Sequence, residues 1–263
     1  MLAYRHLFHA GNFADVFKHA LLAQLVLALG RKEKPFFCLD THAGTGRYDL
    51  THPWAQKNKE YHDGVARVWM RGDAPPALAP YLEAVRAENP DGKLRSYPGS
   101  PVIVRGLLRA RDRLALTELN RTDCAALAAL FAGDRRVNVQ HADGYQALKA
   151  FLPPTERRGL AFVDSSFDRA REFERLTRAF AAAHRKFATG VYALWYPLME
   201  PPAMHAFERG ILATRIPDIL QLELSVRGAG WSASLRGSGM LVANPPFGFE
   251  ATARALLDWL APE

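Results

Sequence analysis

Residues 36–46 read FFCLDTHAGTG, and this stretch decides the fold. An apolar run ends in Asp40, and the chain then turns through small residues that include Gly44 and Gly46. The apolar run is typical of a buried parallel strand, which carries apolar side chains on both faces. The two glycines permit positive φ angles and the close approach of a ligand. We therefore expect a strand, a sharp turn and a ligand crevice at the strand's carboxyl end, with Asp40 facing that crevice.

The glycine pattern alone leaves the ligand open. Dinucleotide-binding turns follow G-x-G-x-x-G, whereas Tyr48 and Asp49 stand here where a third glycine is expected. The looser pattern, an acid followed after three residues by G-x-G, matches S-adenosylmethionine-dependent methyltransferases. A plain strand–turn–helix junction without a ligand is the alternative at this point.

Composition and charge bound the class of protein. The 263 residues include 34 Lys and Arg against 27 Asp and Glu, and the resulting formal charge of +7 favours a polyanionic partner without identifying one. No apolar run approaches the ~20 residues that span a bilayer. The start, Met1 to His6, becomes polar too early for a secretion signal. Cys38 and Cys124 are expected in the core, unpaired, and we expect a cytoplasmic protein.

The first half of the chain contains an interruption. A helix is expected from Phe13 to Leu29, with Asn12 as its N-cap and Gly30 as its stop. The next strand-like run arrives only at residues 114–119, so we interpret residues 50–95 as a helical insertion within a single domain, 1–263. Ser100 is expected as the N-cap of the helix that follows the insertion.

The second half alternates between strands and helices. The expected elements are a helix at 121–132, a strand at 137–141, a helix at 144–151, a strand at 159–164, a helix at 167–187 and a strand at 190–195. Such alternation indicates a doubly wound parallel sheet. Two last strands, 219–226 and 240–243, have no helix between them and are expected to be antiparallel. The predicted fold class is α/β, the Rossmann-like sheet of class I S-adenosylmethionine methyltransferases.

Three acids follow successive strands of this predicted sheet: Asp40, Glu118 and Asp143. In the methyltransferase layout the second acid accepts hydrogen bonds from ribose hydroxyls. Asp143, followed by the permissive Gly144, lies where an adenine amino group is read.

The fourth strand ends in Asp164-Ser165-Ser166-Phe167. Amino-methyltransferases carry Asp/Asn-Pro-Pro-Tyr/Phe at this point. A carboxylate and a backbone carbonyl there accept the two N–H bonds of an exocyclic amine and draw its lone pair toward the methyl donor, while the aromatic residue stacks on the base. Orientation of this kind contributes roughly 7–11 kcal/mol to catalysis. Here the acid and the aromatic residue are present, but both prolines are serines, so the loop lacks their fixed φ.

A competing motif is Asn244-Pro245-Pro246-Phe247, which has the intact pattern near the end of the chain. It follows the last strand, whereas the catalytic loop follows the fourth. We interpret it as a strand exit in which the prolines end the pairing before a final helix at 250–260.

Longer strings now resemble one family, the bacterial 23S ribosomal RNA adenine-N6 methyltransferases of the J type. They are YRHLFHAGNFADVFKH at 4–19, LDTHAGTGRY at 39–48, YPGSP at 97–101, LTEL at 116–119, ADG at 142–144 and YALWYP at 192–197. The resemblance runs the whole length. It implies S-adenosylmethionine as cofactor and 23S ribosomal RNA as substrate, with cofactor contacts from His19, His42, Ser100, Glu118, Asp143, Gly144 and Asp164.

The resemblance also implies that Asp164 is the catalytic acid, and that Tyr4, His6, Lys18 and Phe167 line the target-adenine side. The serines of the Asp-Ser-Ser-Phe loop depart from the family pattern and leave a second hypothesis, a silent relative that only binds RNA or cofactor. A third hypothesis is methylation of DNA adenine or of a protein glutamine through Asn244. No His-Glu-x-x-His pattern is present, so no metal is expected. A monomer without a membrane segment is expected.

Overall fold

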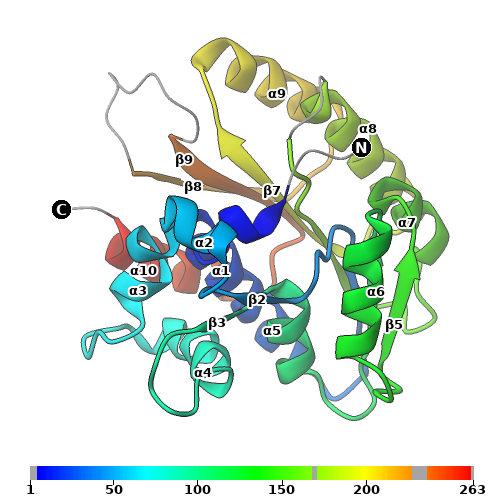
Figure 1. Cartoon of the computed structure of the whole chain (residues 1–263). Helices are drawn as coiled ribbons and strands as arrows, with labels where there is room; N and C mark the ends of the chain where they lie inside the picture. Colours follow the sequence, from blue (N-terminus) through cyan, green and yellow to red (C-terminus); the bar gives the residue numbers. More distant parts are fainter. Residues whose placement is uncertain (1–4, 168–170, 227–235, 262–263) are drawn as a thin grey trace.

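The computed structural model describes residues 5–167, 171–226 and 236–261. A seven-stranded sheet with the order β5-β4-β1-β6-β7-β9-β8 forms its centre (Figure 1). The strands are β1 (Phe37–Asp40), β4 (Arg113–Glu118), β5 (Val137–His141), β6 (Gly159–Val163), β7 (Val191–Leu198), β8 (Ile219–Ser225) and β9 (Gly237–Ala243). The first five in spatial order are parallel, and β9 is antiparallel to both of its neighbours. The predicted class I methyltransferase sheet with its antiparallel last hairpin is confirmed.

Helices cover both faces of the sheet. One core contains side chains from α1 (Phe13–Gly30), α5 (Ser100–Leu107), α6 (Arg121–Leu130) and α10 (Phe249–Leu260). The other contains side chains from α7 (Gly144–Phe151), α8 (Glu172–Lys186) and α9 (Pro201–Ala213). The strands serve both cores because successive side chains point to opposite faces. In β7, for example, Ala193 and Trp195 join the first core, while Leu194 and Tyr196 join the second.

Helix α1 is the apolar centre of the first core. Its 18 residues have a mean hydropathy of 1.4, long and apolar enough for a membrane span by length and composition, but 83% of them are buried inside the protein. The helix packs against α5, α10 and β9. Asn12 caps it as predicted, since its side chain accepts a hydrogen bond from the backbone N–H of Asp15 at 3.0 Å. Burial in the core therefore accounts for the apolar character of α1.

Between β2 (Arg47–Asp49) and β3 (Ser96–Pro98) the chain is helical. This stretch contains α2 (Pro53–Asn58), η2 (Glu60–Asp63), α3 (Val65–Val68), η3 (Pro76–Leu78) and α4 (Ala79–Ala87). β2 and β3 pair antiparallel, so they bring the two ends of the stretch together. This small sheet was not predicted, because strands of three residues are too short to show an alternating pattern. A short 3-10 helix, η1 (His6–Phe8), precedes α1.

Two predicted helix starts are wrong. Ser100 is not the N-cap of α5; Gly99 holds that position, and the Ser100 hydroxyl donates instead to Asp40 Oδ2 at 2.6 Å. Helix α8 begins at Glu172 rather than near Phe167. Phe167 has a φ of +51°, in the left-handed region, so its backbone cannot belong to a right-handed helix.

Candidate functional site

A cavity of about 540 Å³ lies where the loops after β1, β4, β5 and β6 meet the amino end of α1. The carboxyl ends of parallel strands are where open α/β sheets bind ligands. Of the residues predicted as site residues, those that the structure describes all line this cavity: His6, Lys18, His19, His42, Ser100, Glu118, Asp143, Gly144, Asp164 and Phe167. Tyr4 lies outside the described residues. The predicted residues come from distant parts of the sequence, and the fold brings them around one space.

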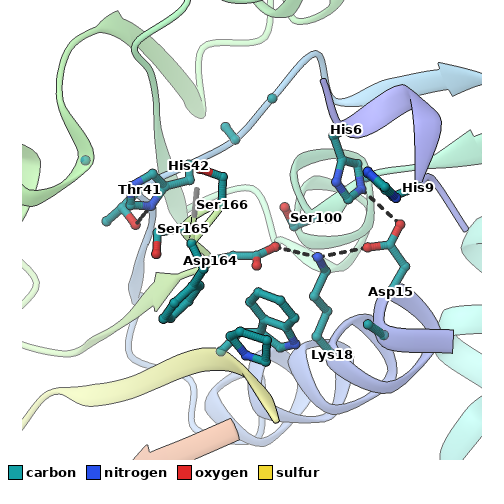
Figure 2. A pocket seen from close by; sticks show the side chains of 18 of the residues that line it. His6, His9, Asp15, Lys18, Thr41, His42, Ser100, Asp164, Ser165 and Ser166 are labelled. Atoms are coloured by element: carbon teal, nitrogen blue, oxygen red, sulfur yellow. Dashed lines mark hydrogen bonds and ion pairs between the residues drawn. The ribbon is translucent and has the colours of Figure 1, made fainter. Parts of the chain in front are cut away.

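The main charged feature of the cavity is a chain of two acids and one lysine (Figure 2). Lys18 Nζ lies 2.7 Å from Asp164 Oδ2 and 2.8 Å from Asp15 Oδ1. Lys18 is only 4% exposed, and its ammonium lies 5.0 Å from the centre of the Trp195 ring. Because a buried charge is tolerated only when it is paired, both carboxylates are needed to hold the ammonium there. Lys18 thereby connects α1 to the loop after β6.

Asp15 is the anchored end of that chain. Its carboxylate is fully buried, and Oδ2 accepts hydrogen bonds from the backbone N–H of Gly11 at 2.7 Å and lies 3.0 Å from His6 Nε2. Burial by itself raises the pKa of Asp15, but the charges of His6 and Lys18 outweigh it and hold the pKa well below its usual range. Asp15 is therefore ionised and fixed in position.

Two cavity histidines are neutral. Burial lowers the pKa of His19 to about 3, and its Nδ1 lies 2.8 Å from the hydroxyl of Tyr97. Burial also lowers the pKa of His42, whose ring meets the Tyr145 ring edge-on. Neutral imidazoles are able to ligate metals, but within residues 5–167, 171–226 and 236–261 no three His, Cys, Asp or Glu side chains are grouped to hold a metal ion.

Glu118 fixes the glycine turn. Its Oε2 accepts from the backbone N–H of Gly44 at 2.9 Å, and its Oε1 accepts from that of Asn120 at 2.6 Å. Burial raises the pKa of this carboxyl above its usual value. The turn itself has the expected backbone, with φ angles of +60° at Gly44 and +78° at Gly46.

Asp143 and Gly144 form the start of α7 at the opposite wall. One carboxylate oxygen of Asp143 caps the helix by accepting from the backbone N–H groups of Tyr145 and Gln146. The other oxygen lies 3.6 Å from Arg175. A Cβ atom at Gly144 would lie 2.2 Å from the carbonyl oxygen of Thr41, so only glycine fits where α7 meets the loop after β1.

Asp40 does not face the crevice, which corrects the prediction. Its carboxylate is 1% exposed beneath the loop, where it accepts from the Ser100 hydroxyl and, at 3.3 Å, from the backbone N–H of His42. Burial is the main cause that raises its pKa to about 7. Asp40 therefore supports the loop from below, while Ser100 reaches the cavity wall.

The two competing motifs lie at opposite ends of the strands of the central sheet. Asp164 to Phe167 follow the carboxyl end of β6 and line the cavity, with the Phe167 ring edge-on to Trp195 at 5.8 Å. Asn244 follows β9, and its side-chain amide donates to the carbonyl oxygens of Ala188 and Gly190, just before β7 begins. Phe247 is 98% exposed. Asn244 is a strand exit, as predicted.

Several cavity residues were missed by the analysis of the sequence. Besides Asp15 they include Trp195, Tyr145, Glu172 and Arg175. The Tyr145 hydroxyl donates to Glu172 Oε1 at 2.7 Å, and the Arg175 guanidinium lies over the Tyr145 ring. The available signal was their position, since Tyr145 directly follows Asp143-Gly144 and Trp195 lies in a predicted strand.

Comparisons with known proteins point to one family. The family model described as "Ribosomal RNA large subunit methyltransferase D, RlmJ" matches residues 33–263. A relative from Escherichia coli, named ribosomal RNA large subunit methyltransferase J, is 44% identical over 260 residues, which cover 99% of this chain and 93% of the relative. A relative of the same name from Haemophilus influenzae is 41% identical over 261 residues, with the same coverage.

A solved structure agrees over nearly the whole fold. The crystal structure of a protein from Legionella pneumophila superimposes with a TM-score of 0.90 at 37% sequence identity. The match covers 96% of this chain and 92% of that protein. The fold of this chain, with its strand order and its helical stretch between β2 and β3, therefore resembles a fold known from a crystal structure.

Proposed function

The chain belongs to the RlmJ family of ribosomal RNA large subunit methyltransferases, and from that premise we propose that it transfers the methyl group of S-adenosylmethionine to N6 of one adenine in 23S ribosomal RNA. The observation that carries the proposal is the position of Asp164. This carboxylate follows β6, lines the cavity, and is held through Oδ2 by the buried Lys18.

The cavity suits the proposed cofactor. A volume of about 540 Å³ falls within the range of roughly 300–1,000 Å³ that is usual for small-molecule sites. Glu118 and Asp143 at the strand ends offer carboxylate acceptors for ribose hydroxyls and an adenine amino group. The positive φ angles of Gly44 and Gly46 shape the turn that borders this cavity. When bound, S-adenosylmethionine supplies a methyl group made electrophilic by the sulfonium to which it is attached.

Asp164 acts on the substrate amine. Its carboxylate accepts a hydrogen bond from the exocyclic N–H, which orients the nitrogen lone pair, and takes up the proton that the amine loses after methylation. An N-methylated adeninium is a strong acid, so a carboxylate is basic enough for this step. Lys18 keeps the carboxylate from turning away, because Lys18 itself is held by Asp15. Positioning is the main catalytic contribution of the chain.

The target adenine must leave its stack to reach Asp164. Phe167 and Trp195 form an aromatic corner beside the carboxylate, where a flipped base can stack. Unpaired or weakly paired RNA is therefore the expected substrate. Lys and Arg side chains of residues 50–95 hold phosphates in this proposal, so binding weakens with salt. The basic loop 227–236, proposed for the same role, lies largely outside the described residues.

The proposal includes the organisation of the protein. Residues 50–95 form a helical insertion within one methyltransferase domain that spans residues 1–263. The protein acts as a monomer in the cytoplasm. A single elution volume at the monomer mass, unchanged when protein concentration is raised, is the expected result in size-exclusion chromatography.

The test uses purified protein, labelled S-adenosylmethionine and naked large-subunit RNA from cells that lack the enzyme. We expect wild-type protein to label the RNA and Asp164→Ala to label it at least about 1,000-fold more slowly, with cofactor affinity changed by less than about 5-fold. Asn244→Ala is the matched control and should keep wild-type turnover.

Each outcome separates the hypotheses. A wild-type protein that binds cofactor and RNA but transfers no label would support the silent relative that Ser165 and Ser166 suggested. Label in DNA or in a protein, lost in Asn244→Ala, would reject the RNA proposal. Undiminished turnover of Asp164→Ala would remove this carboxylate from the mechanism.

A further inference from the structure

A group of aromatic side chains lies on the surface beside the cavity. Phe8 of η1 and Trp54 of α2 stack with their ring centres 5.2 Å apart and an angle of 14° between the rings. His52 meets the Trp54 ring edge-on, and the Lys57 ammonium lies 6.0 Å from the centre of the Phe8 ring. We call these four residues, Phe8, His52, Trp54 and Lys57, the Trp54 platform.

The exposure of Trp54 is not explained by folding. Its side chain is 42% exposed, although α2 buries its neighbour Ala55. Scattered apolar residues are common on protein surfaces. Here, in contrast, a large aromatic ring stacks on a second ring and is flanked by a lysine. This arrangement suits nucleic acid bases, because every base has a π face that can stack on an aromatic side chain.

The platform is continuous with the cavity. Phe8 lies in the chain between His6 and His9, and both histidines line the cavity. On the other side, Glu60 also lines it and joins the two segments, because it lies 2.9 Å from His9 Nδ1 and accepts from the Asn12 side chain at 3.1 Å. Helix α2 packs directly on η1 (Figure 1). A strand of RNA that places one base in the cavity can therefore reach this platform.

The charges near the platform suit such a strand. Lys57 and Lys59 are exposed at the end of α2, where they can contact phosphates. Among the acids that line this side of the cavity, Glu60 is paired with His9 and Asp63 is exposed. The chain as a whole has a formal charge of +7. Charge complementarity favours RNA over an acidic protein surface as the occupant.

We propose that the Trp54 platform stacks an unpaired RNA base that neighbours the target adenine. The proposal rests on the proposed function, because flipping the adenine removes a stacking partner from the adjacent base, and the Trp54 ring replaces that partner. It also explains why the helical stretch between β2 and β3 is part of a methyltransferase: it carries the platform to the cavity mouth.

The first experiment measures methylation of naked large-subunit RNA by Trp54→Ala, Trp54→Leu and Trp54→Phe. Alanine and leucine should raise KM for RNA about 5- to 140-fold, the loss of one base–aromatic stack of roughly 1–3 kcal/mol. Phenylalanine should retain most of the wild-type affinity. Leucine keeps an apolar contact with Phe8, so it separates lost stacking from lost packing. Phe247→Ala removes an exposed aromatic ring in the segment after β9, away from the cavity, and should leave KM for RNA unchanged.

The second experiment measures binding without catalysis, by fluorescence anisotropy of a labelled single-stranded oligoadenylate of about ten nucleotides. Trp54→Ala should bind more weakly by a similar factor, and Lys57→Gln should reduce the slope of log affinity against log salt by about 0.7. An affinity for S-adenosylmethionine equal to that of wild type shows that each variant is folded.

The proposal is overturned if wild-type protein methylates RNA and Trp54→Ala or Trp54→Leu does so with an unchanged KM. That outcome would show that the platform does not stack an RNA base during methylation. Failure of the wild-type protein to methylate would instead count against the proposed function, and the oligoadenylate measurement would still report on the platform.

Discussion

Lys18 is a buried cation whose two carboxylate partners have different surroundings. Asp15 is fully buried and held by Gly11 and His6, while Asp164 is 13% exposed and borders the cavity. The ammonium therefore transfers the rigidity of α1 to the loop after β6. This loop carries serines where other amino-methyltransferases carry prolines. The ion pair holds the Asp164 side chain directly in this loop, which lacks the fixed φ angles of proline.

Asp15 is thus a positioning residue, and Asp15→Asn tests this role. The amide keeps the size of the side chain but leaves Lys18 with one carboxylate, so we expect kcat to fall about 10- to 100-fold with little change in cofactor affinity. Glu250→Gln removes an exposed ion pair with Arg254 and is the control that should leave both values unchanged. A wild-type kcat in Asp15→Asn would contradict the positioning role.

The same variant carries a pH signature. Because the folded pKa of Asp15 is lowered, its ionisation contributes stability that is fully present above the unfolded value near 4 and is lost as pH falls through the folded pKa. The difference in unfolding free energy between wild type and Asp15→Asn should therefore shrink as pH falls below about 4. Urea unfolding at several pH values measures it.

Residues differ in how well the sequence predicts their place in the cavity. The cavity residues were found because they lie in long strings typical of the family, not because their chemistry is visible locally. Lys18 and Asp15 look like ordinary polar positions of a helix until the packing of α1 on both sides is known. Asp40 was placed wrongly for a similar reason. A strand end is predictable, but which side of the loop its carboxylate occupies depends on Ser100, sixty positions later.

Among the structural elements, the loop after β1 and the start of α7 pack tightly against each other at the cavity. At Gly144 an added Cβ atom would lie 2.2 Å from the Thr41 carbonyl oxygen and 2.8 Å from the His42 ring. Neither group can yield easily, since Thr41 is hydrogen-bonded to β6 through its own backbone N–H and hydroxyl. Helix α7 can therefore lie this close to the loop after β1 only because Gly144 has no side chain.

Gly144→Ala should lower cofactor affinity by at least about 10-fold and destabilise the protein by about 1–3 kcal/mol, because α7 or the loop must move. The matched variant is Gly106→Ala in α5, where a Cβ atom has nothing within 4 Å. It should leave cofactor affinity unchanged and raise stability by up to about 1 kcal/mol, as expected for alanine in a helix. Calorimetric titration and urea unfolding measure the two effects. Equal behaviour of both variants would contradict the packing argument.

The predictability of elements follows their length and burial. The buried strands β1, β6 and β7 are mostly apolar runs, so their places along the chain and their parallel direction were predicted correctly. β2 and β3 were missed because each has three residues and owes its existence to pairing with the other. The start of α8 was misplaced because a left-handed Phe167 is set by contacts with Phe173 and Trp195, which no local pattern reveals.

In the whole molecule, two buried acids at opposite ends of neighbouring parallel strands have pKa values shifted in opposite directions. Asp112, just before β4, accepts from the backbone N–H of Phe36 and is paired with Arg109; burial alone raises its pKa, but these partners outweigh burial and lower it. Asp40, at the end of β1, has the Ser100 hydroxyl and one backbone N–H, and burial raises its pKa to about 7. The partners of Asp112 thus stabilise its charge, whereas burial disfavours the charge of Asp40.

This contrast predicts how stability changes with pH. A raised folded pKa means that the folded protein binds more protons than the unfolded chain between about pH 4 and pH 7, so the contribution of Asp40 is present below pH 4 and lost as pH rises through about 7. Relative to Asp40→Asn, wild type should lose up to about 4 kcal/mol of unfolding free energy across that range, which is about three pKa units at 1.36 kcal/mol each.

Relative to Asp112→Asn, wild type should keep a constant advantage in unfolding free energy between pH 5 and 8, because a carboxyl with a lowered pKa titrates only in acid. Urea unfolding of the three proteins at pH 5, 6, 7 and 8 distinguishes the two carboxyls, and parallel curves for wild type and Asp40→Asn would show that Asp40 is already ionised at pH 5.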